Sequence, residues 1–261
     1  MALTTIRVGT SGYSYKDWVG EFYPVGMGEP EFLKYYSNFF DVCEVNYTFY
    51  KMPDCKTALA MLGKSGGKID FAYKLHQSIT HSREDCTNAT KNFIAGIAPS
   101  LEAKKAIAVL AQFPNSFRPD RESWQKIGIL AELLGGVIPL VVEFRSTDWF
   151  RARFFDRLKT LNAGFCCVDE PTGEGLLPPV AIATSDVAYV RMHGRNKFKW
   201  WKHKMPEERY DYLYTKDGLE EWAAKIEKLS SQAKKVLVFF NNHPKGQAAK
   251  NALELKRMMG M

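Results

Sequence analysis

The 261-residue chain contains no long hydrophobic run, no low-complexity tract and no paired-cysteine motif. Its longest apolar stretches, such as residues 236–240, are far shorter than the ~20 residues that a membrane helix needs. Residues 1–8 show no basic region followed by a long apolar run, so no secretory signal is visible. We therefore expect no membrane association.

The five cysteines are odd in number, and no two of them form a C-x-x-C motif. This argues against a disulfide framework and against a thiolate zinc site. Cys166 and Cys167 are adjacent, and a β-strand would point their side chains to opposite faces. We expect reduced thiols and a cytoplasmic protein.

The composition, 46% hydrophobic and 25% charged, is that of a globular chain with material for one large core. The chain has 36 basic and 29 acidic residues, which gives a net charge of +7. This excess permits an anionic partner without requiring one. The length suits two small domains or one barrel-sized domain, so the periodicity must decide between them.

Eight short apolar segments, rich in β-branched and aromatic residues, recur along the chain. Most are continuous rather than alternating, as in parallel strands that are covered on both faces. Patterns with helical spacing lie between them, for example Leu219, Trp222, Ile226 and Leu229 behind Asp217 as a predicted N-cap. The strand segments are residues 6–10, 42–47, 71–75, 106–113, 140–144, 164–169, 188–192 and 235–241.

This alternation over a chain of about 250 residues predicts a single (β/α)8 TIM barrel that spans residues 1–261. A doubly wound open sheet is the alternative, because strand order cannot be read from one sequence. Two connections depart from a regular barrel. Residues 170–185, after the sixth strand, carry three prolines and two glycines and should be mostly loop. Residues 195–215, after the seventh strand, form a long insertion.

The carboxyl ends of barrel strands meet around one mouth, and every predicted strand end carries a polar or ionisable residue. Glu143 and Arg145 share a strand face, where the arginine can hold the carboxylate ionised or bind a planar anion. An internal ion pair with a structural role is the alternative. The predicted catalytic residues are Glu143, Glu44, His193 and Asp169, and the predicted binding residues at the strand ends are Ser11, Asn46, Tyr50, Lys74, His81, Arg145, Arg191, Asn241 and Asn242.

A divalent metal is compatible with these residue types, since Glu44, Glu143, Asp169 and two histidines are suitable ligands. However, no H-x-x-x-H, H-E-x-x-H or D-x-D motif fixes a ligand geometry, so the metal stays an open alternative. Residues 9–12, Gly-Thr-Ser-Gly, match neither the dinucleotide nor the P-loop pattern, and we expect no nucleotide cofactor.

The insertion after the seventh strand alternates cations with aromatic residues. This pattern suits contacts to phosphates combined with stacking on a base or sugar, and we include Lys199 and Trp200 among the binding residues. A solvated loop whose tryptophans pack down as anchors is the alternative. We also expect the segment to act as a lid over the mouth. Its residues are Arg195, Lys197, Phe198, Lys199, Trp200, Trp201, Lys202, His203 and Lys204.

Several motifs, in order along nearly the whole chain, resemble the YecE-like proteins. They are residues 8–18 (VGTSGYSYKDW), 22–24 (FYP), 45–50 (VNYTFY), 143–145 (EFR), 189–194 (YVRMHG) and 240–251 (FNNHPKGQAAKN). The resemblance implies a TIM-barrel domain of unknown function with a shared pocket at the mouth, not an established reaction. It carries over the strand-end residues named above together with Gly9, Gly12, Thr48 and Asn251.

The leading functional hypothesis is a hydrolase of phosphodiesterase type that acts on a phosphorylated, sugar-containing or nucleic-acid ligand. Arg145, Arg191 and Lys74 would bind anionic oxygens, and Glu143 or Glu44 would act as general base. One alternative is a non-catalytic nucleic-acid-binding protein that uses the basic and aromatic insertion. The other is a small-molecule sensor with the same pocket and no turnover.

Overall fold

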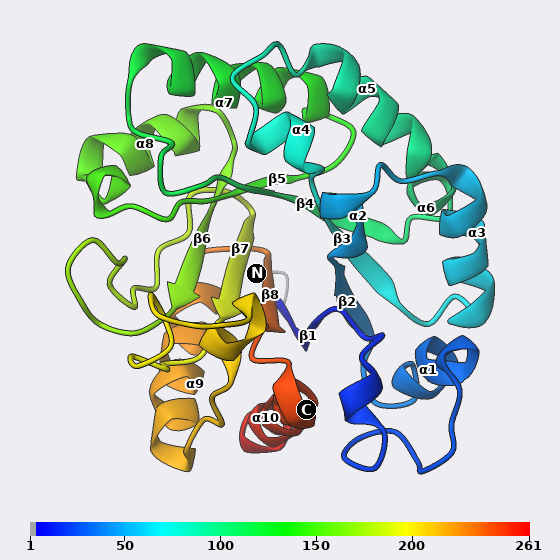
Figure 1. The fold of residues 1–261 in the computed structure, drawn as a ribbon. Coiled ribbons are helices and arrows are strands. Elements are labelled where there is room, and N and C mark those ends of the chain that lie inside the picture. Colours follow the sequence, from blue (N-terminus) through cyan, green and yellow to red (C-terminus); the bar gives the residue numbers. More distant parts are fainter. Residues whose placement is uncertain (1–3) are drawn as a thin grey trace.

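Eight parallel strands close into one barrel in sequence order, and β8 pairs again with β1. The structure, a computed structural model, describes residues 4–261; residues 1–3, part of the segment searched for a secretory signal, lie outside the described residues. Figure 1 shows the strands at the centre and the helices around them. The strands are β1 (Thr5–Ser11), β2 (Val42–Val45), β3 (Asp70–Lys74), β4 (Ala106–Gln112), β5 (Leu140–Glu143), β6 (Gly164–Asp169), β7 (Val187–Met192) and β8 (Lys235–Phe240).

Helices follow every strand except β6, so the predicted barrel is confirmed and the open sheet is excluded. Residues 170–186, between β6 and β7, contain no helix, as their prolines and glycines predicted. The α-helices are α1 (Glu29–Tyr36), α2 (Tyr47–Tyr50), α3 (Cys55–Lys64), α4 (Gln77–Thr80), α5 (Thr87–Gly96), α6 (Ala98–Glu102), α7 (Arg121–Leu134), α8 (Ala152–Thr160), α9 (Lys216–Ser230) and α10 (Gln247–Met258). Single turns of 3₁₀ helix are η1 (Lys16–Trp18), η2 (Thr147–Trp149), η3 (Pro206–Tyr210) and η4 (Pro244–Gly246).

Two element boundaries differ from the predictions. Helix α9 is capped by Thr215, whose hydroxyl accepts from the Gly218 amide at 3.3 Å, so the prediction of Asp217 as N-cap is wrong. Strand β2 ends at Val45 rather than at residue 47, because the chain turns there into α2. The Thr48 hydroxyl donates to the carbonyls of Val45 at 3.0 Å and Lys74 at 2.6 Å, which fixes this turn against β3.

The strands are covered on both faces, and this explains their continuous apolar sequences. In β6 the Cys166 thiol lies 4.0 Å from a Glu143 carboxylate oxygen inside the barrel, whereas the Cys167 thiol lies 3.4 Å from the Ile182 carbonyl outside it. The predicted opposite orientation of the two thiols is confirmed. All five cysteines are free, and no helix within residues 4–261 is long and apolar enough to cross a membrane.

Gly9 allows α1 to pack directly on the barrel between β1 and β2. The Tyr36 hydroxyl donates to the Val42 carbonyl at 3.0 Å and accepts from the Thr10 amide at 3.0 Å. A Cβ on Gly9 would lie 2.2 Å from the Val42 carbonyl oxygen and 3.1 Å from the Tyr36 hydroxyl. Backbone and a buried ring therefore leave no room for any side chain at this position.

We expect Gly9→Ala to lower the free energy of unfolding by about 1–3 kcal/mol, because the added methyl must push β2 away. Gly128→Ala is the matched control, since a Cβ on Gly128 in α7 meets nothing within 4 Å. That control should raise stability by about 0.5–1 kcal/mol. Urea unfolding measures both, and equal effects of the two substitutions would contradict the packing described here.

Candidate active site at the barrel mouth

A buried ion network crosses the barrel at the carboxyl ends of its strands. Arg191 of β7 donates from Nε at 3.0 Å and from Nη2 at 2.7 Å to the two carboxylate oxygens of Glu44 in β2. Its Nη1 donates to Glu143 Oε2 in β5 at 2.6 Å. The Tyr189 hydroxyl adds a bond to Glu44 at 2.7 Å, and Arg145 Nη2 lies 2.9 Å from Glu143 Oε1. Two carboxylates and two guanidinium groups thus neutralise one another.

His193 extends this network as a neutral group. Its Nδ1 lies 3.0 Å from the Asn241 side-chain amide nitrogen, which can only donate, so Nε2 carries the proton toward Glu143 Oε1 at 3.3 Å. Burial, followed by the charge of Arg145, lowers the pKa of His193 to about 3. His193 is therefore a fixed hydrogen-bond donor at neutral pH rather than a cation.

Glu143 has little capacity to act as a base. Burial alone would raise its pKa, but the charges of Arg145 and Arg191 and the bond from His193 outweigh burial and hold the pKa well below the usual range. Both carboxylate oxygens of Glu44 likewise accept hydrogen bonds, from Arg191 and Tyr189. The geometry therefore favours the structural alternative for both carboxylates over the general-base role that we predicted.

Lys74, at the end of β3, lines a cavity of about 220 Å³ above this network. Its amino group lies 4.2 Å from the centre of the Phe49 ring and makes no ion pair or hydrogen bond with any residue in the described part of the chain. Burial, followed by the charge of Arg191, lowers the pKa of Lys74 to about 7. The other residues that line this cavity are Tyr15, Asn46, Tyr50, Arg145, Arg191, Tyr210, Asn241 and His243.

A second cavity of about 220 Å³ adjoins the first, and Arg145 and Tyr210 line both. Glu170 lies in this second cavity, where its Oε1 accepts from the Leu177 amide at 3.0 Å and its Oε2 has no hydrogen-bond partner among residues 4–261. Arg145 Nη1 is 3.6 Å from that free oxygen. Burial raises the pKa of Glu170 to about 7. A buried carboxyl group whose pKa lies near neutral therefore faces Arg145 at the wall of this cavity.

Asp169 lies apart from the other predicted catalytic residues. It accepts from Trp222 Nε1 at 2.8 Å, from the Tyr214 hydroxyl at 2.5 Å and from Arg195 at 2.8–3.0 Å. These bonds attach α9 and the insertion to the outer face of β6. Because side chains alternate along a strand, Glu170 and not Asp169 follows the inward direction of Cys166.

Most of the predicted residues converge on the mouth, but four others besides Asp169 do not. The Ser11 hydroxyl is buried without a partner and lines neither cavity, and Asn242 binds the Tyr212 carbonyl at 2.8 Å and Asn251 at 3.0 Å. His81 lies on an exposed rim, with its ring 5.0 Å from that of Phe49. Lys199 pairs with Glu208 at 2.9 Å within the insertion. The residues brought together are Glu44, Asn46, Tyr50, Lys74, Glu143, Arg145, Arg191, His193, Trp200 and Asn241.

Sequence reasoning missed several residues that line the mouth. Tyr15 and His243 form a flat wall, with ring planes 6° apart and ring centres separated by 4.6 Å. Tyr210 and Arg209 reach the mouth from η3, in a part of the insertion where no strand spacing applies. Glu170 was detectable, because alternation would have selected it once the direction of one β6 side chain was known.

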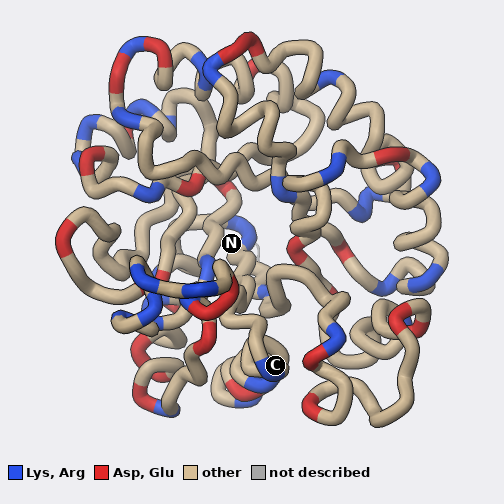
Figure 2. The backbone as a smooth tube through the Cα atoms, in the orientation of Figure 1, with Lys and Arg blue, Asp and Glu red and all other residues tan. Residues whose placement is uncertain are grey.

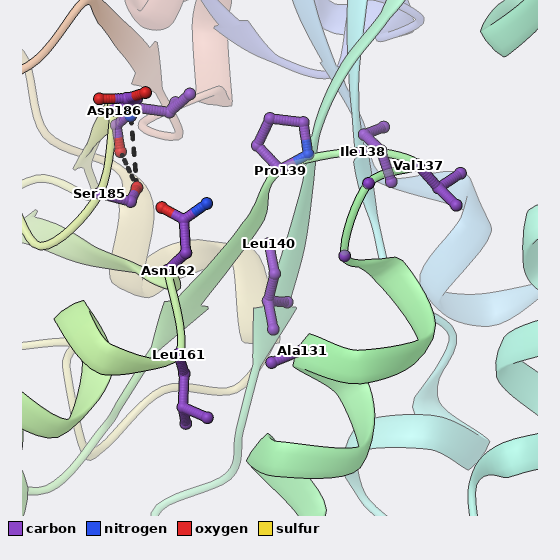
Figure 3. A pocket seen from close by; sticks show the side chains of 12 residues that line it. Ala131, Val137, Ile138, Pro139, Leu140, Leu161, Asn162, Ser185 and Asp186 are labelled. Carbon is purple, nitrogen blue, oxygen red and sulfur yellow. Dashed lines mark hydrogen bonds between the residues drawn. The ribbon is translucent and has the colours of Figure 1, made fainter.

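No group of three or more His, Cys, Asp or Glu side chains within residues 4–261 is arranged to share a metal ion. The two mouth carboxylates that were candidate ligands face Arg191 instead. Figure 3 shows a different cavity, of about 320 Å³, at the opposite end of the barrel near the starts of β5 and β7. Its only ionisable lining residue, Asp186, pairs with Lys234 at 2.7 Å, so reactive groups concentrate at the mouth.

Glu143→Gln should lower the free energy of unfolding by about 3–5 kcal/mol, since it leaves Arg145 and Arg191 with one buried carboxylate fewer. Chemical unfolding monitored by circular dichroism measures the loss. Glu227→Gln on the exposed face of α9 is the control and should change stability by less than about 0.5 kcal/mol. A Glu143→Gln protein as stable as this control would contradict a structural role for the network.

Comparison with known proteins agrees with this fold and gives no reaction. Residues 7–261 match the family described as "Protein of unknown function DUF72". The UPF0759 protein YunF of Bacillus subtilis (strain 168) is 30% identical over 270 residues, which cover 97% of this chain and 94% of YunF.

Solved structures extend the likeness to three dimensions. A DUF72 family protein from Thermotoga maritima MSB8 has 38% sequence identity and a TM-score of 0.91, covering 98% of this chain and 100% of its own. One from Enterococcus faecalis V583, at 23% identity, a TM-score of 0.87 and coverages of 98% and 96%, shares the fold. The chain therefore belongs to the DUF72 family, another name for the YecE-like proteins that its motifs resemble.

Proposed function

We propose that this protein is an enzyme that binds a small phosphorylated ligand across the two mouth cavities and hydrolyses its phosphoester. One observation carries the proposal: Glu170, with a free carboxyl oxygen and a pKa of about 7, lies in the same cavity as Arg145 and Arg209. Phosphoester hydrolysis needs cationic donors for the phosphoryl oxygens and a group that moves protons at neutral pH. The cavity offers both.

Arg145 and Arg209 are the groups that would hold the phosphate. Arg145 lines both cavities, and Arg209 Nε has no hydrogen-bond partner among the described residues. Guanidinium groups bind phosphate through paired N–H donors. Arg191, by contrast, has all three of its nitrogens on Glu44 and Glu143, so it would set the local charge rather than bind the ligand.

The first cavity would receive the rest of the ligand. Asn46 has a buried amide oxygen without a partner, and Asn241 and Tyr50 add further polar groups. The flat wall of Tyr15 and His243 suits a sugar ring. These features favour a sugar phosphate over a bare anion.

In the proposed reaction, ionised Glu170 accepts a proton from the water that attacks phosphorus. The P–O bond to the leaving group breaks, and protonated Glu170 returns the proton to the leaving oxygen. Arg145 and Arg209 stabilise charge on the non-bridging oxygens. Glu170 thus takes the role that we had predicted for Glu143 or Glu44.

The insertion would form a fixed wall of this site rather than a lid that opens and closes. Trp200, only 3% exposed, lines the second cavity. Arg195 is held by Asp169, and the Asn196 side chain donates to the carbonyls of Glu208 at 3.2 Å and Asp211 at 2.9 Å. These bonds tie both ends of the segment together and favour a fixed wall that excludes water.

Glu170→Gln should lower kcat on p-nitrophenyl phosphate, a phosphomonoester like the proposed sugar phosphate, by roughly 10²–10⁴-fold, because the amide cannot accept the proton. Wild-type kcat should rise as the pH passes upward through the Glu170 pKa of about 7, and this limb should vanish in the variant. Glu207→Gln, an exposed carboxylate of η3, is the control. Inorganic phosphate binding, measured by calorimetry, should survive Glu170→Gln and weaken in Arg209→Met.

An unchanged rate in Glu170→Gln would contradict the catalytic role of this residue. Absence of phosphate binding would contradict the ligand class. Binding without hydrolysis of any phosphate ester would favour the small-molecule sensor.

A nucleic-acid-binding role is the second candidate, and exposed aromatic side chains favour it. Phe198 is 91% and Trp201 63% exposed, and both lie among Lys197, Lys202 and Lys204, which form no ion pair within residues 4–261. Single-stranded nucleic acids bind through stacking and lysine contacts of this kind. Figure 2 shows the basic stretches of this insertion next to the acidic stretch of η3.

Phe198→Ala and Trp201→Ala should each weaken binding of an oligo(dT) of about 12 nucleotides by about 1–3 kcal/mol, because each removes one stacking surface. Fluorescence anisotropy at several salt concentrations measures affinity and its salt dependence. Leu213→Ala, an exposed apolar residue of the same insertion, is the control. Equal affinity in all three variants, or no binding at low salt, would contradict this candidate.

We further propose a cytoplasmic location. All five cysteines are unpaired, and four of them are buried. Free thiols of this kind are typical of reducing compartments.

A further inference from the structure

Lys74 lines the first mouth cavity, and the proposed hydrolysis does not use it. Its amino group has no hydrogen-bond acceptor or carboxylate partner in the described part of the chain. Two other partly buried lysines are bonded: Lys126 donates to the carbonyls of Ile79 at 3.1 Å and Ser82 at 2.6 Å, and Lys105 to Asp70 at 2.9 Å. An amine without a partner that faces a cavity is free to meet a ligand.

Burial disfavours the protonated form of Lys74. Arg145 and Arg191 line the same cavity, and the two nearby carboxylates, Glu44 and Glu143, are already paired with them. Burial, followed by the charge of Arg191, lowers the pKa of Lys74 to about 7, although Glu143 and Glu44 oppose this shift. A desolvated lysine next to other cations is a stronger nucleophile at neutral pH than a surface lysine, because its lone pair is free.

We propose that Lys74 forms an imine with an aldehyde or ketone group of the ligand whose phosphate is held by Arg145 and Arg209. The two cavities adjoin at Arg145 and Tyr210, so one ligand can place its phosphate in the second cavity and its carbonyl in the first. This inference rests on the phosphate-binding part of the proposed function and not on hydrolysis.

Imine formation by Lys74 needs only the amine and the carbonyl group of the ligand, and it releases one water molecule. The Lys74 nitrogen forms a bond to the carbonyl carbon, and the proton that it loses goes to the carbonyl oxygen to give a carbinolamine. That hydroxyl then leaves with a second proton as water, and a C=N bond remains. The imine, when protonated, is a cation that the Phe49 ring, 4.2 Å from the amine, stabilises through its π-face.

The size of the site limits the ligand to a short chain. Each cavity holds about 220 Å³, so a ligand that spans both has space at the lower end of the usual range of about 300–1,000 Å³ for small-molecule sites. Asn46 and Asn241 can bind hydroxyl groups beside the carbonyl. The substrate class is therefore a short phosphorylated hydroxy-aldehyde or hydroxy-ketone.

Dihydroxyacetone phosphate with sodium cyanoborohydride tests the inference, because this reductant persists between about pH 6 and about pH 8 and reduces an imine to a stable amine. Intact-mass and peptide analysis of the wild-type protein should find one adduct on Lys74. Its yield should rise from about pH 6 to about pH 8 as the amine loses its proton. Inorganic phosphate should compete, Lys74→Met should abolish the adduct, and Lys91→Met, an exposed control in α5, should retain it.

Peptide mapping of the wild-type protein needs no variant, so a folding defect in Lys74→Met does not affect the result. No adduct on Lys74, or equal labelling of surface lysines, would overturn the inference. If inorganic phosphate still binds in that case, a phosphorylated ligand remains supported and only the imine at Lys74 is contradicted. If phosphate does not bind either, both proposals fall.

Discussion

The bonds of Arg191 to Glu44 and Glu143 set the chemistry of the barrel mouth. They join β7 to β2 and β5 through groups that are buried from solvent. Buried charges of this kind are tolerated only when each has a partner, so the arginine and both carboxylates are committed to one another. The groups free to act on a ligand are those that this network leaves over.

Two of the residues that this network leaves over differ in the sign of their charge. Glu170 keeps one carboxyl oxygen without a partner, and Lys74 keeps an amino group without one. Burial raises the pKa of the acid and lowers that of the amine, so both approach about 7. The structure thus sets two proton-exchanging groups in adjoining cavities that meet at Arg145.

The barrel and the position of its mouth were predictable, because apolar periodicity depends on neighbours along the chain. The two-residue spacing of Glu143 and Arg145 identified one inward face correctly. Asp169 and Glu170 could not be separated, because spacing gives alternation without direction. The pairing of Glu143 with Arg145 was predicted, but its bond to Arg191 was not, because Arg191 lies 48 residues further along the chain.

In the insertion after β7, the sequence likewise could not predict which cations would pair with acidic residues. Composition locates its cations, but Arg195 is bound by Asp169 and Lys199 by Glu208. Trp200 packs down, as the alternative of a solvated loop with anchoring tryptophans predicted, whereas Trp201 remains exposed. The contacts that decide which cations are paired and which tryptophan is buried form only in the folded chain.

The central claim is that the network neutralises itself and leaves Lys74 as an uncompensated amine. Carbon-13 NMR of protein labelled at lysine Cε, with Lys74→Met to assign the signal, measures the pKa of that amine directly. We predict a titration near 7, well separated from the ordinary lysine value of about 10.4. A Lys74 signal that titrates with the surface lysines would contradict the account.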